Sequence, residues 1–282
     1  MSDPHKIDYL LDEIITLPSQ PQTLARITKL VDDSDCSLAD VAKVISADPS
    51  IALKSLRLVN SAHYGLRNKV VSVEHAVMLL GLKVIRNLVL TATVFETFAK
   101  GATSLLHHSV ACGVAMRVVV ETRDIELPGD AEDTFVYGLL HDIGKIVFQE
   151  FLPEDTAIAL ELSSTRGLST FQAEQEVIGC DHAELGARLA QKWMLPAQLV
   201  AAIAGHHDLD RCEDADSREL SALLAVSDYI CWCCGLVSAP GASIDVDDSV
   251  WESAKLTSRQ IPAMLDAFFG VFHEVRELTQ LA

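Results

Sequence analysis

The chain has 282 residues, 49% of them hydrophobic and 22% charged, which is enough to bury a substantial core in one or two domains. Acidic residues outnumber basic ones 40 to 22, and the net charge of −18 would repel a phosphate backbone, so no nucleic-acid partner is expected. The start of the chain lacks the pattern of a signal peptide, and no uncharged apolar run is long enough to cross a membrane. We therefore expect no membrane partner and a cytoplasmic location.

The seven cysteines follow no regular spacing, which is typical of reduced thiols. Three of them cluster in one helical pattern, namely Cys231, Cys233 and Cys234. No second cysteine pair lies nearby in the sequence, so the pattern favours packed core residues over a zinc site.

The first third of the chain predicts a bundle of short helices. Ser37 followed by Asp40 resembles a capping box, and Asp48-Pro49 is a cap with proline in the first helical turn. The single histidines of this part, His63 and His75, are expected to be structural. Predicted helices cover residues 7–17, 21–32, 37–46, 48–61, 72–81 and 82–98.

The rest of the chain is also helical in pattern, and no stretch alternates like a β-strand, so the predicted fold class is all-α. We place a domain boundary near residues 100–104, which separates an N-terminal helical bundle, 1–100, from a second helical domain, 101–282. Predicted helices of the second domain cover 104–123, a segment to Phe151 that includes His141-Asp142, 153–165, a segment from Ser169, 181–194, a segment ending at His206-His207, 220–236, a segment around Trp251, and 262–278.

One short stretch, Gly138-Leu-Leu-His141-Asp142-Ile-Gly-Lys145, places a histidine and an aspartate inside an apolar run. Burial of both groups is unfavourable unless a partner compensates for the lost hydration. A divalent metal ion is such a partner, because it binds a carboxylate oxygen and an imidazole nitrogen directly. For an isolated pair, a core histidine beside a helix-capping aspartate would be the simpler interpretation.

Further ligand-type residues favour the metal hypothesis. Inward-facing side chains from separate helices commonly form metal sites in helical bundles. Asp142 could bridge two ions, and Lys145, one turn after His141, could neutralise a phosphate oxygen. The candidate ligands, on five predicted helices, are His108, His141, Asp142, His182, His206, His207 and Asp228.

Simpler roles remain open for single members of this set. His206 and His207 close a helix, where positive charge is favourable. Asp181 is expected only to cap a helix. His107 and His108 cannot point the same way, and we favour His108 as the ligand.

The order of these residues resembles the HD superfamily of metal-dependent phosphohydrolases, and the doubled His206-His207 is similar to its HD-GYP branch, which degrades cyclic dinucleotides. The N-terminal third resembles the HDOD (HD-related output domain) family. The residues that carry this second resemblance are Asp48-Pro49, Leu58-Val-Asn-Ser-Ala62, Tyr64-Gly65, Leu79-Leu-Gly-Leu82 and Arg86-Asn-Leu88.

The resemblance implies a bacterial signalling module, since HDOD proteins have this role and many have lost the metal ligands. This chain keeps a candidate at every core HD position. It departs from HD-GYP in that residues 208–212 follow His207 in place of Gly-Tyr-Pro, and Ser104 stands where some HD-GYP proteins carry a further carboxylate. The missing carboxylate at Ser104 argues against a third metal and against cyclic di-GMP as substrate.

Two functional hypotheses follow. In the first, the chain is a metal-dependent phosphohydrolase that acts on a nucleotide or another small phosphate ester. Two divalent ions, iron or manganese with zinc, nickel or magnesium as alternatives, would be held by the candidate ligands, and Asp142 and Lys145 would be catalytic.

In the second hypothesis, the chain is a non-catalytic signalling or scaffold module that acts through protein partners. Four polar residues in otherwise apolar helices of the first third could contact such a partner, although local pairing is the simpler expectation. They are Arg57, Asn60, Arg86 and Asn87.

Overall fold

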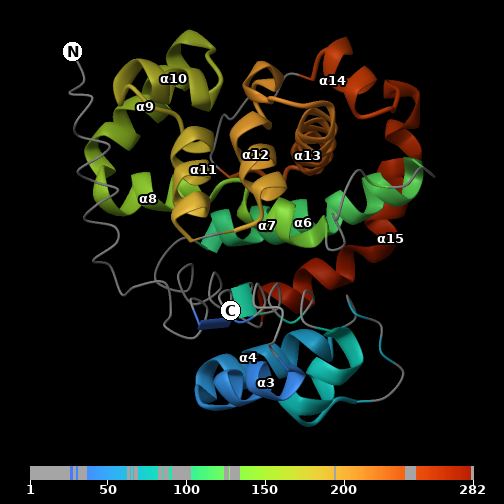
Figure 1. The fold of residues 1–282 in the computed structure, drawn as a ribbon. Coiled ribbons are helices and arrows are strands. Elements are labelled where there is room, and N and C mark those ends of the chain that lie inside the picture. The colour runs from blue at the N-terminus through green and yellow to red at the C-terminus, as the bar shows by residue number, and fades with distance from the viewer. Residues whose placement is uncertain are drawn as a thin grey trace. The chain divides into compact units, whose positions relative to one another are not determined.

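The computed structural model describes residues 26–27, 30, 37–61, 64, 66, 69–81, 85, 89–90, 103–123, 127, 134–193, 195–238 and 246–280. Every regular element within these ranges is a helix, which confirms the predicted all-α class (Figure 1). The chain groups into two compact units. The larger includes residues 102–272, and the smaller includes residues 15–101 and 273–282.

In the smaller unit, the predicted helix starts after Ser37 and Asp48 are confirmed. Helix α3 (Leu38–Ser46) begins after Ser37, whose hydroxyl accepts a hydrogen bond from the Asp40 amide. Helix α4 (Pro49–Val59) begins after Asp48, whose carboxylate accepts from the Ile51 amide at 3.2 Å. Residues 73–81 are helical as well. The predicted helices over 7–17, 82–98 and most of 21–32 lie outside the described residues.

Asn60 pairs locally within this unit. Its side-chain amide donates to the carbonyls of Leu56 and Val70, and its oxygen accepts from the Val70 amide at 2.8 Å. These bonds tie the end of α4 to the following loop, and they fit the simpler of the two expectations for Asn60. Arg86 and Asn87 lie outside the described residues.

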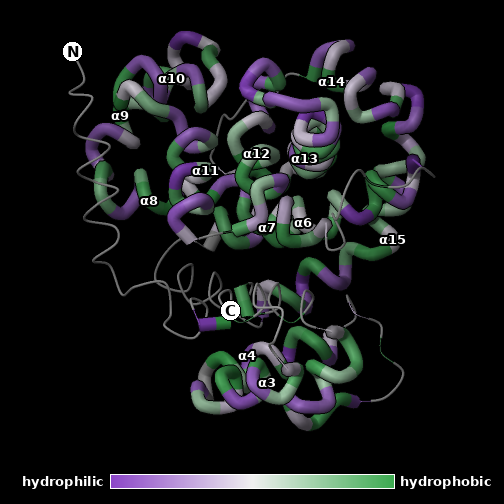
Figure 2. The backbone as a smooth tube through the Cα atoms, viewed as in Figure 1, coloured by the Kyte–Doolittle hydropathy of each residue, from purple (hydrophilic) through white to green (hydrophobic). Residues whose placement is uncertain are grey.

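The larger unit contains the elements that carry the candidate ligands. Its helices are α6 (Thr103–Arg123), α7 (Thr134–Leu140), α8 (Ile143–Phe151), α9 (Pro153–Arg166), α10 (Thr170–Val177), α11 (His182–Lys192), α12 (Ala197–Gly205), α13 (Ala215–Cys233), α14 (Asp248–Ser253) and the first part of α15 (Ile261–Thr279). Short 3₁₀ turns cover Leu209–Arg211 and Ser258–Gln260. Helix α7 is buried along its whole length and mostly hydrophobic (Figure 2).

The predicted continuous helix through His141 and Asp142 is wrong. The two residues form a turn between α7 and α8, and Asp142 has φ −96° and ψ 13°, outside the helical range. The apolar run around them contains no proline that would have marked the break. Asp142 takes the cap position of α8 but its side chain makes no capping hydrogen bond, so the carboxylate is directed elsewhere.

Two glycines beside this turn allow other helices to approach closely. A Cβ atom on Gly138 would lie 2.3–2.4 Å from backbone atoms of Cys112 and Gly113, where α7 packs on α6. A Cβ atom on Gly144 would lie 2.1 Å from the His182 carbonyl oxygen, where α8 packs on α11. The backbone contacts on both sides of the turn therefore require glycine.

We predict that Gly138→Ala lowers the free energy of unfolding by about 2 kcal/mol or more, because neither backbone can move aside without disturbing its helix. Gly270→Ala is the matched control. No atom lies within 4 Å of a Cβ at that position of α15, so this change should raise stability by about 0.5–1 kcal/mol. Chemical denaturation of both variants measures the difference, and a Gly138 variant as stable as the wild type would contradict the close packing.

Candidate metal centre

The structure brings all seven predicted ligands together in the larger unit. They come from α6, the α7–α8 turn, the start of α11, the end of α12 and the middle of α13. Only His207 is partly accessible, and the other side chains are buried. The seven residues are His108, His141, Asp142, His182, His206, His207 and Asp228.

One oxygen of Asp142 faces a first group of ligand atoms. Asp142 Oδ2 lies 3.4 Å from Nε2 of both His108 and His141, and these two nitrogens are 3.2 Å apart. Asp228 Oδ1 lies 3.3 Å from His108 Nε2. We call these four residues the first cluster.

The other oxygen of Asp142 faces a second group. Asp142 Oδ1 lies 3.2 Å from His182 Nε2 and 4.0 Å from His206 Nε2. His207 Nε2 is 3.0 Å from His182 Nε2. We call Asp142, His182, His206 and His207 the second cluster, so that Asp142 belongs to both clusters.

Four of the histidine rings are held in the same way. The Nδ1 atoms of His108, His141 and His206 each meet a backbone carbonyl oxygen at 2.7–2.8 Å. Nδ1 of His182 meets the Glu174 carboxylate at 2.6 Å. In the neutral form of each ring, Nδ1–H can donate to its acceptor, which leaves the lone pair on Nε2 on the side of Asp142, as in metal-binding histidines.

Several buried polar atoms of the clusters have no hydrogen-bond partner among the described residues. They include Asp142 Oδ1, Asp228 Oδ1 and His206 Nε2. Leaving such atoms unpaired is unfavourable by several kcal/mol in total. All are electron-pair donors that point at one another, and a cation is the partner that satisfies them together. The donor set therefore fits divalent metal ions.

Burial and neighbouring charges shift the imidazole pKa values in opposite directions. Burial would lower the pKa of His108, but the Asp142 and Asp228 carboxylates outweigh it and raise the value to about 9. Burial and the neighbouring histidines keep the pKa values of His206 and His207 well below the usual range. Those two rings are neutral at pH 7, the form that binds metals.

Lys145 lies at the edge of the first cluster and is itself buried. Its ammonium group donates to Asp142 Oδ2 at 2.7 Å and to the Ser238 hydroxyl at 2.9 Å. Burial lowers the pKa of Lys145, but the carboxylates of Asp142, Glu174 and Asp228 together outweigh it and raise the value. The structure thus pairs Lys145 with the shared carboxylate.

The residues given simpler roles are also placed. His107 is exposed, beside the buried His108, and His75 is exposed, whereas His63 lies outside the described residues. Asp181 caps α11 as predicted, and it also pairs with Arg211 at 2.6 Å. The expectation of packed core cysteines holds for Cys231, which is buried, but is wrong for Cys233, which is exposed at the end of α13.

Sequence reasoning missed three residues beside the clusters. Glu174 of α10 is buried, and its carboxylate accepts from both Nδ1 and the backbone amide of His182. Phe171 stacks on His207, with ring centres 5.1 Å apart. Cys112 lies one helical turn after His108. Only the cysteine had a sequence signal, its four-residue spacing from His108 on one helix face.

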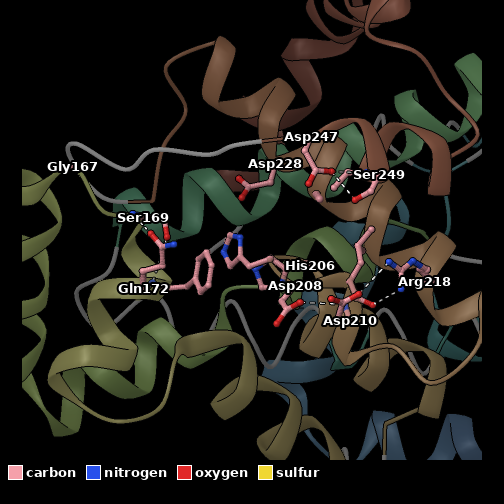
Figure 3. Close-up of a pocket in the computed structure, with 15 residues that line it drawn as sticks. Gly167, Ser169, Gln172, His206, Asp208, Asp210, Arg218, Asp228, Asp247 and Ser249 are labelled. Atoms are coloured by element: carbon pink, nitrogen blue, oxygen red, sulfur yellow. Dashed lines mark hydrogen bonds and ion pairs between the residues drawn. The ribbon is translucent and has the colours of Figure 1, made fainter.

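A pocket of about 440 Å³ opens onto both clusters. Its lining includes His206, His207 and Asp228, and Figure 3 shows Ser169 and Gln172 opposite Asp208 and Asp210. Three further carboxylates line it, those of Asp208, Asp210 and Asp247, whereas Arg218 is the one arginine or lysine among the described lining residues.

The sequence matches the family model of the HDOD domain over residues 17–209, which is more than half of the chain. The chain belongs to the HDOD family. This match confirms the family resemblance seen in the N-terminal third. The matched residues also include six of the seven candidate ligands, all except Asp228.

A protein of Treponema pallidum (strain Nichols) that is named only as uncharacterized is 29% identical over 204 residues. The match covers 71% of this chain but 39% of that protein, so the chain spans about two fifths of the length of this curated relative.

Solved structures show the same fold at low sequence identity. An HDOD domain protein of unknown function from Geobacter sulfurreducens superposes with a TM-score of 0.75, at 23% identity and over 99% of both chains. A proposed phosphohydrolase from Shewanella amazonensis SB2B has a TM-score of 0.67, at 22% identity, over 96% of this chain and 97% of that one. A proposed metal-dependent phosphohydrolase from the same organism has a TM-score of 0.62, at 17% identity, over 97% and 99%.

None of the helices among the described residues has the length and apolar character that crossing a membrane requires.

Carboxylates that orient a metal-binding histidine typically contribute 10–100-fold to metal affinity. We therefore predict that Glu174→Gln weakens divalent-metal binding by about that factor, because the neutral amide no longer favours the His182 tautomer with a free Nε2. Glu176→Gln on the same helix is the control, since Glu176 is half-exposed and pairs with Arg166. Competition with a chromogenic chelator measures both, and equal affinities would rule out the orienting role.

Proposed function

We propose that the larger unit of this HDOD protein binds two divalent metal ions and hydrolyses a phosphate ester that enters the adjoining pocket. The observation that carries the proposal is the position of Asp142. Its two oxygens face two separate sets of imidazole Nε2 atoms, at 3.2–3.4 Å from the nearest ones.

In this proposal, the first cluster holds one ion and the second cluster holds the other, with Asp142 shared between them. Imidazole and carboxylate ligands suit first-row transition metals such as iron and manganese. Bound ions of this kind lower the pKa of water and stabilise the charge that develops on a phosphoryl group. The names of the structural relatives in Shewanella amazonensis are consistent with this chemistry.

The protein's own residues would serve positioning and electrostatic roles. Lys145 balances the charge of Asp142 and keeps that carboxylate ionised in a buried setting. The Phe171–His207 stack provides an apolar wall at the pocket, and Gln172 and Ser169 offer polar groups beside it. A pocket of this size accepts a small ester of nucleotide dimensions.

A non-catalytic signalling function is the second candidate. Lys145 is paired with Asp142 and Ser238 and is absent from the described lining of the pocket, so it is not placed to meet a phosphate oxygen. The carboxylates of the lining also disfavour a polyanionic substrate such as a dinucleotide. A metal-bound module that signals through protein partners would need neither feature.

The first test is the metal content of the purified full-length chain. We expect about two iron or manganese ions per chain, lost in Asp142→Ala, and a melting temperature that falls on treatment with a chelator, because bound ligand stabilises the folded state. Asp216→Ala, an exposed aspartate of α13, is the control and should keep its metal. A wild-type protein without metal, whose stability equals that of the Asp142 variant, would refute the metal centre.

The second test separates the two candidate functions. Metal-loaded wild type is screened for hydrolysis of phosphomonoesters and nucleotides beside Asp142→Ala and His141→Ala. The enzymatic proposal expects a loss of at least about 100-fold in both variants, the size typical of removing a group that stabilises transition-state charge. Full metal occupancy with equal background in all three proteins would favour the signalling function.

A further inference from the structure

A side chain of a kind that imidazole–carboxylate centres lack, the thiol of Cys112, lies beside the first cluster. The ligand-forming atoms of Cys112, His141 and Asp228 all lie within 4.8 Å of one another. All three residues are buried, and Cys112 has no measurable exposure. Cys112 also follows His108 by four residues on α6, so both face the same way.

The packing explains why the sulfur reaches this point. Gly138 of α7 lies directly on the backbone of Cys112, at a distance that would place a Cβ atom 2.3–2.4 Å from its carbonyl group. His141 follows Gly138 by three residues and anchors its ring on the Gly138 carbonyl oxygen. The glycine contact therefore holds the Cys112 thiol and the His141 ring side by side.

The first cluster leaves room for another donor. Asp142 Oδ2, the oxygen that faces this cluster, accepts a hydrogen bond from Lys145 at 2.7 Å. Asp228 Oδ1 is buried and has no hydrogen-bond partner among the described residues. His108, His141, Asp142 and Asp228 provide four ligand groups, and a transition-metal ion such as iron can accept further ligands beyond these.

We propose that Cys112 is a further ligand of the first metal position, so that this position is a mixed site of two imidazoles, two carboxylates and one thiolate. The inference rests on the proposed metal centre and deepens it. Metal–sulfur and metal–nitrogen bonds of about 2.3 and 2.0 Å, at a bond angle of about 90–110°, place the two ligand atoms about 3.0–3.5 Å apart. The ligand atoms of Cys112, His141 and Asp228 lie within 4.8 Å of one another, so binding would draw them inward by up to roughly 1–2 Å.

A thiolate changes which metal the site selects. Sulfur is a soft ligand, and it favours zinc and iron over manganese and magnesium. On binding, the thiol proton is released to solvent and a metal–sulfur bond forms, with no change of oxidation state. The first position should therefore take zinc or iron(II), whereas the second, with imidazole and carboxylate ligands, remains open to manganese.

Cys231 provides the matched control. It comes from α13, is equally buried and lies next to Cys112, but the groups of ligand atoms found among the described residues do not include it. Cys112→Ser and Cys231→Ser therefore remove the same atom from neighbouring positions of one core.

The test uses full-length protein stripped of metal under anaerobic conditions and reloaded with cobalt(II). We expect a near-ultraviolet sulfur-to-cobalt charge-transfer band in the wild type and in Cys231→Ser, and its loss in Cys112→Ser. We also expect the cobalt affinity of one of the two positions to fall at least tenfold in Cys112→Ser. X-ray absorption of the wild-type zinc form should show a sulfur neighbour at about 2.3 Å, which requires no variant to fold.

The outcomes separate this inference from the proposed metal centre. Cobalt or zinc bound by the wild type with no sulfur signal in either measurement would overturn the thiolate ligand and leave the metal centre intact. Loss of the band in Cys231→Ser alone would show that the sulfur ligand is Cys231 of α13 and would equally overturn the assignment to Cys112. A wild type that binds no metal would overturn both proposals.

Discussion

The burial of Asp142 is the constraint on which the larger unit depends. An ionised carboxylate inside a helical core is strongly unfavourable unless other groups compensate for the lost hydration. Here the compensation comes from Lys145 on one oxygen and from imidazole rings around both. Because those rings belong to separate helices, the arrangement of α6, α8, α11 and α12 around one turn follows from the need to surround this group.

Close packing at two glycines and the orientation of the histidine rings also help to surround the buried Asp142 carboxylate. Gly138 and Gly144 let backbones approach on either side of the turn, so imidazoles from different helices can meet within 3.0–3.4 Å of their neighbours. Backbone carbonyls and Glu174 then fix the outer nitrogen of four of the five rings. The hydrogen bonds at Nδ1 thereby determine which ring nitrogen can bind a metal ion, since they leave the lone pair on Nε2.

The family assignment and the site point to different aspects of function. The HDOD resemblance implies a signalling module, whereas the two clusters have the residue types that the proposed metal-dependent phosphohydrolase would use as ligands. The proposed metal centre, with its buried lysine and acidic pocket, is compatible with both signalling and hydrolysis. Bound metal would stabilise one folded state whether or not a substrate is turned over. The proposed Cys112 ligand would give such a centre a preference for softer metals.

The sequence by itself determined the helical class, several helix starts among the described residues and the set of candidate ligands that the fold brings together, because caps and apolar periodicity are local signals and because His and Asp are rare in apolar helices. Only the tertiary structure decided the break at His141-Asp142, the pairing of Lys145 with Asp142, and the positions of Glu174 and Cys112 beside the clusters. Glu174 and Cys112 reach the clusters through contacts between helices that are distant in the chain, whereas Lys145 and Asp142 are three residues apart and pair because both are buried. Glu174 looks like any surface glutamate in the sequence until α10 places it against His182, and no local pattern encodes that contact.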